Sequence, residues 1–503
     1  MSGFVAEFGQ SGGSGVESMM KTIAHRGPHV QGIYSTGNIT MSQNYLRADT
    51  ARDMDAPAVP LVAGEKAICY DGEIGNWGDL ARDRDIVEGP LKDEQLLLAL
   101  YSEHGTGMFE YLDDAIFSFL ISDGEQCIAA RDVLGIKTLF YGKKDNKIYL
   151  SSELKGLIRI TGDVHEFPAG HYMDGSGNFT PFAALPDTPP AVNGHGVETA
   201  VENIRGIIHR SFHSRIDFSL PTGSLLSGGI DSSVIASIAS SAYKESFGDD
   251  ARLKTFALGV GESGDIINAR KVAESLGTEH HELIVGLQEL LDVLPQVIYH
   301  LESFDPSLVR SSIANYLISK FAAESGIEVL LSGEGGDEVF CGYTFFKKLP
   351  AEQLFENQIK CLGYLHSNAS LRLDRMNACN SVRVVTPLIS GELLNYSLAL
   401  PPEYKIRDNG KDKIEKWIFR KSFENDLPES VVWRLKQEFS QGSGSADVLP
   451  SHFEQIVTDE DLAAVQSEFP IIRSKEECYY FNIFREHFSS SQAVNTVGQW
   501  ISL

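Results

Sequence analysis

In the first part of the chain, hydrophobic residues occur in short runs that polar residues interrupt. The runs 66–70, 115–121, 126–130 and 147–151 are separated by segments that contain Gly, Asp and Asn. Short strands with polar turns between them are typical of antiparallel sheets. The pattern therefore predicts stacked antiparallel sheets, a β-sandwich, in this part of the chain.

The second part of the chain alternates between two patterns. Hydrophobic runs at 224–226, 254–259 and 328–331 predict strands, and the segments 232–241 and 269–276 have the periodicity of helices. Strands that alternate with helices form parallel sheets, whose ligands bind beyond the carboxyl ends of the strands. The segment 186–200 has the proline and glycine content of a linker, so we predict one domain over 1–185 and another over 201–503.

Composition and charge narrow the class of protein. The chain has 503 residues, which suits two or three domains, and its 69 acidic and 43 basic residues give a net charge of −26. A charge of this sign repels nucleic acid and anionic membranes, and it favours chemistry on small molecules. The six cysteines lack the paired spacing of a metal site, and no apolar run approaches the roughly 20 residues that cross a bilayer. We predict a reduced, cytoplasmic protein.

A turn rich in glycine and serine follows the predicted strand 224–226. Glycines let the backbone approach an anion closely, and the start of a helix offers unpaired N–H groups to a phosphate. Asp231 can hold a magnesium ion on the same phosphates. The turn by itself also fits an ordinary loop. The residues predicted to bind pyrophosphate are Ser227, Gly228, Gly229, Asp231, Ser232 and Ser233.

A second turn of this kind follows the predicted strand 328–331. It reads Ser332-Gly333-Glu334-Gly335-Gly336-Asp337-Glu338 and carries three carboxylates. An acidic surface turn is the simpler interpretation, but alternate acids after an apolar strand suit magnesium and a reacting centre better. Two such loops can face one ligand.

The two loops resemble those of the asparagine synthetase family, which are ATP-dependent amide-forming ligases. The family's Ser-Gly-Gly-Leu-Asp-Ser-Ser and Ser-Gly-Glu-Gly-Ser-Asp-Glu loops differ here only at Ile230 and Gly336. The resemblance runs in the family's order up to about Phe488, through motifs at 24–28, 71–74, 131–135, 152–155, 167–170, 276–282 and 434–439. It implies an Ntn-hydrolase-like glutaminase domain flanked by helices, an ATP-pyrophosphatase domain, the cofactors ATP and Mg²⁺, and a possible homodimer.

The resemblance also implies the chemistry of the second domain. The family adenylates a carboxylate, releases pyrophosphate and lets an amine displace AMP. Asp231 and Asp337 would share the magnesium, Glu334 would take a proton from the attacking amine, and Lys436 would steady charge on the α-phosphate. Arg310 would clamp the α-carboxylate of an aspartate-like acceptor, although a surface ion pair explains it equally well. Further nucleotide contacts are implied for Leu226, Leu258, Ser332 and Gly333.

The first domain departs from the family at its reacting centre. The family hydrolyses glutamine with a cysteine that follows the initiator methionine, and this chain has Ser2 there. A hydroxyl is a far poorer nucleophile than a thiol. Asp71 replaces the asparagine that donates to the oxyanion, and an ionised carboxylate cannot donate. The glutamine pocket is still matched by Gly72, Glu73 and Asp93, and its arginine lies near Arg47.

Two hypotheses follow for the amine and three for the function. The first domain is either a glutaminase with a substituted nucleophile or a domain that only supports the fold while free ammonia reacts. For the whole chain, the alternatives to an asparagine-synthetase-like ligase are a β-lactam-type synthetase with another carboxylate and amine, and a non-catalytic binding protein. Between 383 and 390 three charged positions of the family pattern are changed or lost, so the acceptor carboxylate stays open.

Overall fold

The computed structural model describes residues 2–9, 14–37, 39–46, 57–84, 86, 88–191, 196–261, 263–434 and 445–499. The chain divides into two compact units, which we call the first unit (1–185 with 488–496) and the second unit (186–487 with 497–503). Helix α5 (Val197–His213) begins inside the segment predicted as a linker. Within the described residues, no helix is long and apolar enough to cross a membrane.

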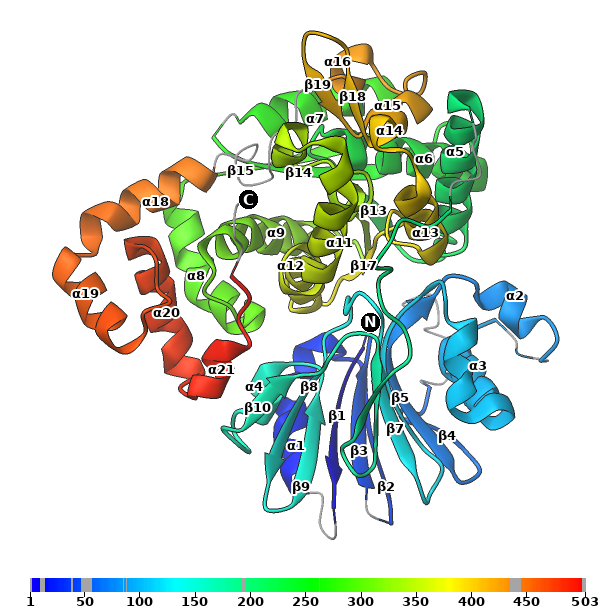
Figure 1. Cartoon of the computed structure of the whole chain (residues 1–503), viewed down its shortest axis with the longest axis vertical. Helices are drawn as coiled ribbons and strands as arrows, with labels where there is room; N and C mark the ends of the chain where they lie inside the picture. Colours follow the sequence, from blue (N-terminus) through cyan, green and yellow to red (C-terminus); the bar gives the residue numbers. More distant parts are fainter. Residues whose placement is uncertain are drawn as a thin grey trace. The chain divides into compact units, whose positions relative to one another are not determined.

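The first unit contains two six-stranded antiparallel sheets, in the orders β10-β8-β9-β1-β3-β2 and β12-β11-β7-β6-β5-β4 (Figure 1). Their strands are β1 (Ser2–Phe8), β2 (Val30–Thr36), β3 (Ile39–Tyr45), β4 (Leu61–Ala63), β5 (Lys66–Ile74), β6 (Ala115–Ser122), β7 (Cys127–Arg131), β8 (Phe140–Lys144), β9 (Lys147–Ser151), β10 (Val164–Glu166), β11 (His171–Asp174) and β12 (Phe179–Pro181). The helices of this unit are α1 (Ser14–Thr22), α2 (Trp77–Ala81), α3 (Lys92–His104), α4 (Leu154–Leu157) and α21 (Ser491–Asn495).

Two hydrophobic layers hold this unit together. Phe4 and Ala6 of β1 pack between the sheets against Leu120 of β6, and all three side chains are fully buried. Leu96 and Leu100 of α3 pack on the outer face of the second sheet. Helix α1 packs against β1 of the first sheet, and all residues of β1 are buried. The predicted antiparallel sandwich with flanking helices is confirmed.

A segment from the end of the chain completes the first unit. Helix α21 packs near β10, where the Ser490 hydroxyl donates to the Gly162 carbonyl at 2.7 Å. Ala493 of this helix is fully buried. The first unit is therefore built from two stretches of sequence that lie about 300 residues apart.

The second unit is built on a five-stranded parallel sheet, in the order β15-β14-β13-β16-β17. Its strands are β13 (Thr222–Leu225), β14 (Lys254–Val260), β15 (Glu279–Val285), β16 (Val329–Leu331) and β17 (Arg383–Val385), and β18 (Ile406–Asp408) pairs with β19 (Lys413–Glu415) in a separate hairpin. Besides α5, its helices are α6 (Ile230–Phe247), α7 (Gly264–Leu276), α8 (Leu287–Leu301), α9 (Pro306–Glu324), α10 (Gly336–Val339), α11 (Leu354–Tyr364), α12 (Ala369–Ala378), α13 (Gly391–Ala399), α14 (Pro402–Lys405), α15 (Trp417–Ser422), α16 (Glu429–Val432), α18 (Ser445–Ile456), α19 (Asp459–Glu468) and α20 (Lys475–His487).

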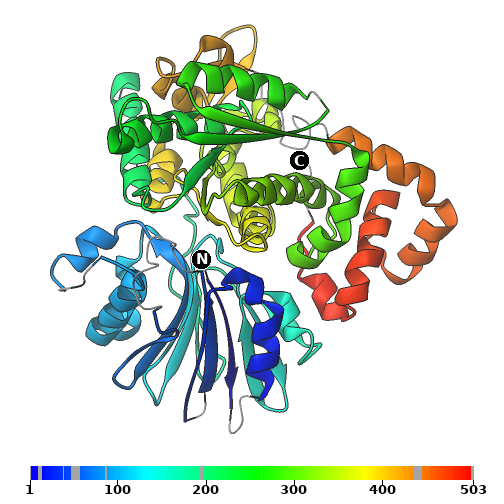
Figure 2. The same ribbon diagram turned by 180° about the vertical axis from the view of Figure 1, so that it is seen from behind.

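Helices cover both faces of the parallel sheet (Figure 2). Ala257 of β14 belongs to the core that α6 and α7 form on one face. The ring of Phe256, the preceding residue, meets Phe321 of α9 edge-on at 5.9 Å on the other face. Successive residues of a strand point to opposite faces, so both must be apolar when both faces are covered. The predicted α/β architecture of this region is confirmed.

Candidate active site

The first predicted loop joins the carboxyl end of β13 to the amino end of α6. Gly228 has φ +70°, and a Cβ there would lie 2.5 Å from the Asn268 carbonyl carbon, so a larger residue would clash. The Ser227 amide donates to the Ser232 hydroxyl at 3.2 Å, and the two hydroxyls lie 3.1 Å apart. The 18-residue helix α6 begins without a side-chain cap, so no capping side chain occupies its first amides, which can bind an anion.

The second predicted loop joins β16 to the short helix α10 and contacts the first. A Cβ on Gly333 would lie 2.5 Å from the Asp231 carbonyl carbon, and one on Gly336 would lie 2.4 Å from an Asp231 carboxylate oxygen. Neighbouring strands of the sheet bring the loops together, because β13 pairs directly with β16. The two glycine-rich turns therefore do face one site, and their glycines permit that approach.

A cation that the sequence did not indicate lies between the two predicted metal ligands. The Lys416 ammonium is 2.7 and 2.6 Å from the carboxylate oxygens of Asp231 and 2.6 Å from Asp337. The side chain of Lys416 is only 1% exposed. Both carboxylates thus point at one position that a cation fills, which fits the chemistry of a magnesium site. Among the described residues, no cluster of three or more His, Cys, Asp or Glu side chains could hold a metal alone.

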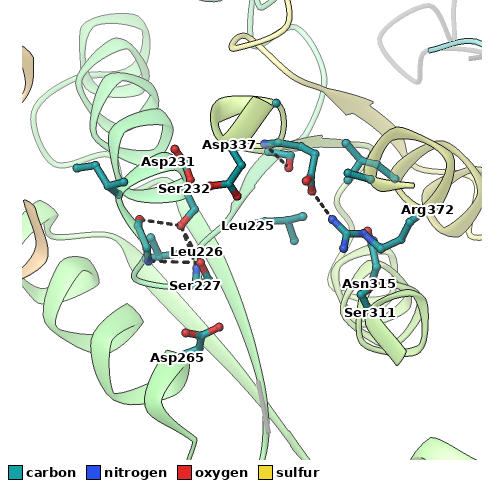
Figure 3. Close-up of a pocket in the computed structure, with 18 of the residues that line it drawn as sticks. Leu225, Leu226, Ser227, Asp231, Ser232, Asp265, Ser311, Asn315, Asp337 and Arg372 are labelled. Atoms are coloured by element: carbon teal, nitrogen blue, oxygen red, sulfur yellow. Dashed lines mark hydrogen bonds and ion pairs between the residues drawn. The ribbon is translucent and has the colours of Figure 1, made fainter. Parts of the chain in front are cut away.

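The two loops open into a cavity of about 210 Å³ in the second unit. It extends from the ends of β13 and β14 to helices α9 and α12, and Figure 3 shows Ser227 and Asp231 on one side with Ser311, Asn315 and Arg372 on the other. The predicted nucleotide residues that line it are Leu226, Ser227, Gly229, Asp231, Ser232, Leu258, Ser332, Gly333 and Asp337. Gly228 and Ser233 are not among the lining residues, and Ser233 is fully buried.

The predicted base, Glu334, lines this cavity and has a cationic partner. Its carboxylate forms an ion pair with Arg372 of α12, and its amide donates to the Ser332 hydroxyl at 3.2 Å. Sequence reasoning missed Arg372, because an arginine inside a helical pattern looks the same whether it faces a cavity or water. The pair places one carboxylate and one guanidinium at the end of the cavity that lies away from Ser227.

The remaining predicted residues of this region lie in different places. Arg310 of α9 does not line the cavity, and its guanidinium is 3.8 Å from Glu476 of α20. Lys436 lies outside the described residues. Arg434, the last described residue before it, lines the cavity, where it donates to the Gly228 carbonyl at 3.3 Å and to the Asp265 carboxylate at 3.2 Å.

Glu338, the last residue of the second loop, is a buried acid. Burial, together with the neighbouring charges of Asp337 and Glu334, raises the pKa of Glu338 to about 7. The Tyr343 hydroxyl donates to the Glu338 carboxylate at 2.5 Å, and Tyr343 also lines the cavity. The acidic loop therefore carries less negative charge near neutral pH than its sequence suggests.

The reacting centre predicted in the first unit is a network of buried charges. The Asp71 carboxylate accepts from the Ser2 amide at 3.3 Å and from Arg26 at 2.7 Å, and Lys137 lies 3.3 Å from it. Arg26 also donates to the Ser2 carbonyl and to Glu153, both at 3.0 Å. The Ser2 hydroxyl donates to a main-chain carbonyl of β5. Asp71 is thus held as a hydrogen-bond acceptor at the position where the family places a donor.

The described residues predicted for the glutamine pocket lie on β5 and α3. Gly72 and Glu73 continue β5, and a Cβ on Gly72 would lie 2.3 Å from the Ile116 carbonyl oxygen. Asp93 lies in the first turn of α3 and accepts from the Tyr70 hydroxyl at 3.0 Å. Arg47, the predicted carboxylate-binding residue, lies outside the described residues.

The parallel sheet with two glycine-rich loops and the antiparallel sandwich fit the ATP-dependent amide-forming ligases that the sequence resembles. The sequence matches the asparagine synthase family over residues 203–369 and 351–499, and it matches the glutamine amidotransferase domain over residues 1–180. The chain therefore belongs to the asparagine synthase family.

Relatives match the chain over nearly its whole length. Asparagine synthetase B (glutamine-hydrolyzing) of Escherichia coli is 34% identical over 95% of this chain and 89% of its own. A probable asparagine synthetase (glutamine-hydrolyzing) of Dictyostelium discoideum is 32% identical over 96% and 92%, and asparagine synthetase (glutamine-hydrolyzing) 1 of Saccharomyces cerevisiae is 31% identical over the same shares. These relatives do not favour the hypothesis of a β-lactam-type synthetase.

Proposed function

We propose that the chain is an ATP-dependent ligase that adenylates a carboxylate, releases pyrophosphate and transfers ammonia to the activated carbonyl. The observation that carries the proposal is the meeting of the two glycine-rich loops around one cavity that also contains Glu334. The aspartate side chain is the proposed acceptor, which would make asparagine the product, because the matching relatives are named asparagine synthetases.

The phosphate end of the cavity has the groups that this reaction needs. Ser227, Ser232 and the first amides of α6 would hold pyrophosphate. Asp231 and Asp337 would hold Mg²⁺, which neutralises phosphate charge when bound. Lys416, which is ion-paired to both carboxylates, would add a further positive charge near the phosphates. The adenosine would lie against the strand ends at Leu226 and Leu258, which also line the cavity.

The reacting end of the cavity has a base and a cation. Glu334 would accept the proton that the amine loses when it attacks the acyl adenylate. Ser332 would hold the adenylate, and Lys436 remains our predicted partner of the α-phosphate. Arg434 reaches the same region from the described part of that segment and would add positive charge near the nucleotide.

For the amine, we propose free ammonia in preference to glutamine. The Ser2 hydroxyl is a weak nucleophile, and Asp71 offers an acceptor where the tetrahedral intermediate needs a donor. Gly72, Glu73, Asp93 and Arg47 stay predicted residues of a glutamine pocket that no longer reacts efficiently. A homodimer and a cytoplasmic location also stay predictions.

One experiment tests the reaction and the amine together. The protein is incubated with ATP, Mg²⁺ and aspartate, with either ammonium or glutamine, and pyrophosphate and asparagine are measured in the same samples. We expect asparagine with ammonium and little with glutamine. Efficient synthesis from glutamine would contradict the proposal for the amine, and absence of both products would contradict the proposed acceptor.

A further inference from the structure

One end of the cavity is lined by polar side chains that are not among the predicted nucleotide contacts. Ser311 and Asn315 of α9 and Arg372 of α12 gather there, across the cavity from Ser227 (Figure 3). We propose that Arg372 and Asn315 hold the carboxylate of the acceptor that does not react, and thereby select the acceptor. This inference rests on the proposed function, because it names the residues that recognise the acceptor of that ligase.

Asn315 supplies the first argument. Its side chain is 3% exposed, it lines the cavity, and its Nδ2 has no hydrogen-bond partner among the described residues. A buried amide without a partner is unfavourable unless a ligand or water satisfies it. Because Nδ2 only donates, its partner must be an acceptor, such as a carboxylate oxygen.

The shape of the guanidinium supplies the second argument. The Arg372 guanidinium is ion-paired to Glu334, and its side chain is 10% exposed. A guanidinium has five N–H donors in one plane, so it can hold Glu334 along one edge and a second carboxylate along another. Arg372 and Asn315 come from two helices, α12 and α9, that pack against each other, which keeps their donors together.

The arginine predicted from the sequence has different surroundings. Arg310 lies on α9 as well, but it points toward Glu476, whose own carboxylate also accepts from the Tyr480 hydroxyl at 2.8 Å. Glu476 is buried in this arrangement. Arg372 and not Arg310 is therefore the arginine that lines this end of the cavity.

Arg372 would also position the proposed base, because its guanidinium is ion-paired to the Glu334 carboxylate. Arg372 is in this sense both a specificity residue and a positioning residue for the base.

The test compares two acceptors that differ in one carboxylate, aspartate and 3-aminopropanoate. For each protein, kcat/KM for pyrophosphate release with ammonium is measured for both acceptors, and their ratio is calculated. Effects that act only through Glu334 are common to both acceptors and cancel in this ratio. We expect the ratio to fall about 10- to 100-fold in Arg372→Gln and about 3- to 10-fold in Asn315→Leu. In Asn315→Leu the change should appear in KM for aspartate, with kcat little altered.

Arg270→Gln is the matched control, because Arg270 is ion-paired to Glu282 at 2.8 Å and does not line the cavity. It should keep the wild-type ratio. Aspartate should also raise the midpoint of thermal unfolding of the wild type and of Arg270→Gln, and do so less in Asn315→Leu. An unchanged ratio in both cavity variants, or a loss caused by Arg310→Gln alone, would overturn this inference. Absence of pyrophosphate release by the wild type with either acceptor would instead overturn the proposed function.

Discussion

Glutamine hydrolysis should return only when two residues of the first unit are replaced together. Ser2→Cys supplies a thiol at the predicted nucleophile position. Asp71→Asn replaces a carboxylate by an amide that can donate to an oxyanion. We expect the double variant to hydrolyse glutamine at least about 100-fold faster than Ser2→Cys alone.

The size of this effect follows from the charges at the centre. Loss of one oxyanion donor alone reduces kcat by about 10²- to 10³-fold. A carboxylate about 4 Å from an oxyanion adds a repulsion of about 4 kcal/mol at an effective dielectric constant of 20. Arg26, at 2.7 Å from Asp71, and Lys137, at 3.3 Å, offset part of that repulsion. The effect of the lost oxyanion donor, about 10²-fold, is therefore the lower bound for the rate difference between the double variant and Ser2→Cys.

The substitution at Asp71 also affects the fold of the first unit. Arg26 is fully buried and would lose its ion pair with Asp71, while its contact with Glu153 at 3.0 Å is unaffected. We expect the free energy of unfolding to fall by about 1–3 kcal/mol. Ammonium-dependent activity of the second unit then serves as the internal check that each variant is folded.

The assay measures glutamate released from glutamine by the wild type, both single variants, the double variant and Ser2→Ala. Intact mass confirms that each sample begins at residue 2, so that the α-amino group of that residue is available. Equal activities of Ser2→Cys and the double variant would refute the role given to Asp71. Efficient hydrolysis by the wild type that Ser2→Ala abolishes would refute the whole interpretation of this centre.

Three further predictions concern the second unit. Glu334→Gln should leave pyrophosphate release intact and slow amide formation, and equal rates of amide formation would remove Glu334 as the base. Lys416→Met should lower the free energy of unfolding by about 3 kcal/mol, because Asp231 and Asp337 lose their shared cation. Mg²⁺ should restore part of that loss in urea unfolding, and no response to Mg²⁺ would argue against a metal between these carboxylates. Because burial raises the pKa of Glu338 from 4.5 to about 7, the folded state favours its protonated form, and the associated stability is lost as the pH rises through 7. Glu338→Gln should therefore be more stable than the wild type at pH 8, by up to about 3 kcal/mol, and the difference should be smaller at pH 5. A difference in stability that does not change with pH would contradict the raised pKa of Glu338.

The local features of the fold and the site could be predicted from the sequence. The strand predicted at 147–151 is β9, and the strand predicted at 254–259 is β14 with one residue more. The two glycine-rich loops were predictable for the same reason, since strand, turn and helix follow one another within a few residues. Patterns of this kind depend only on near neighbours in the chain.

Features that depend on distant residues could not be predicted. Lys416 contacts Asp231, which is 185 positions away in the sequence, and Arg372 contacts Glu334, which is 38 positions away. A lysine or arginine at a buried junction has the same local pattern as one on the surface, so neither gave a signal. The same limit applies to Asn315, which looks like an ordinary polar residue of α9 until the cavity is known.

The return of residues 488–496 to the first unit has a consequence for the order in which the protein is made. About 300 residues separate the main part of this unit from its last helix, α21. At about 5–20 residues per second, a ribosome needs about 15–60 seconds to add them. During that time β10 lacks its contact with α21. The first unit thus begins to form before the second unit but is complete only when residues 488–496 have been made, so a nascent chain that stops before them lacks part of both units.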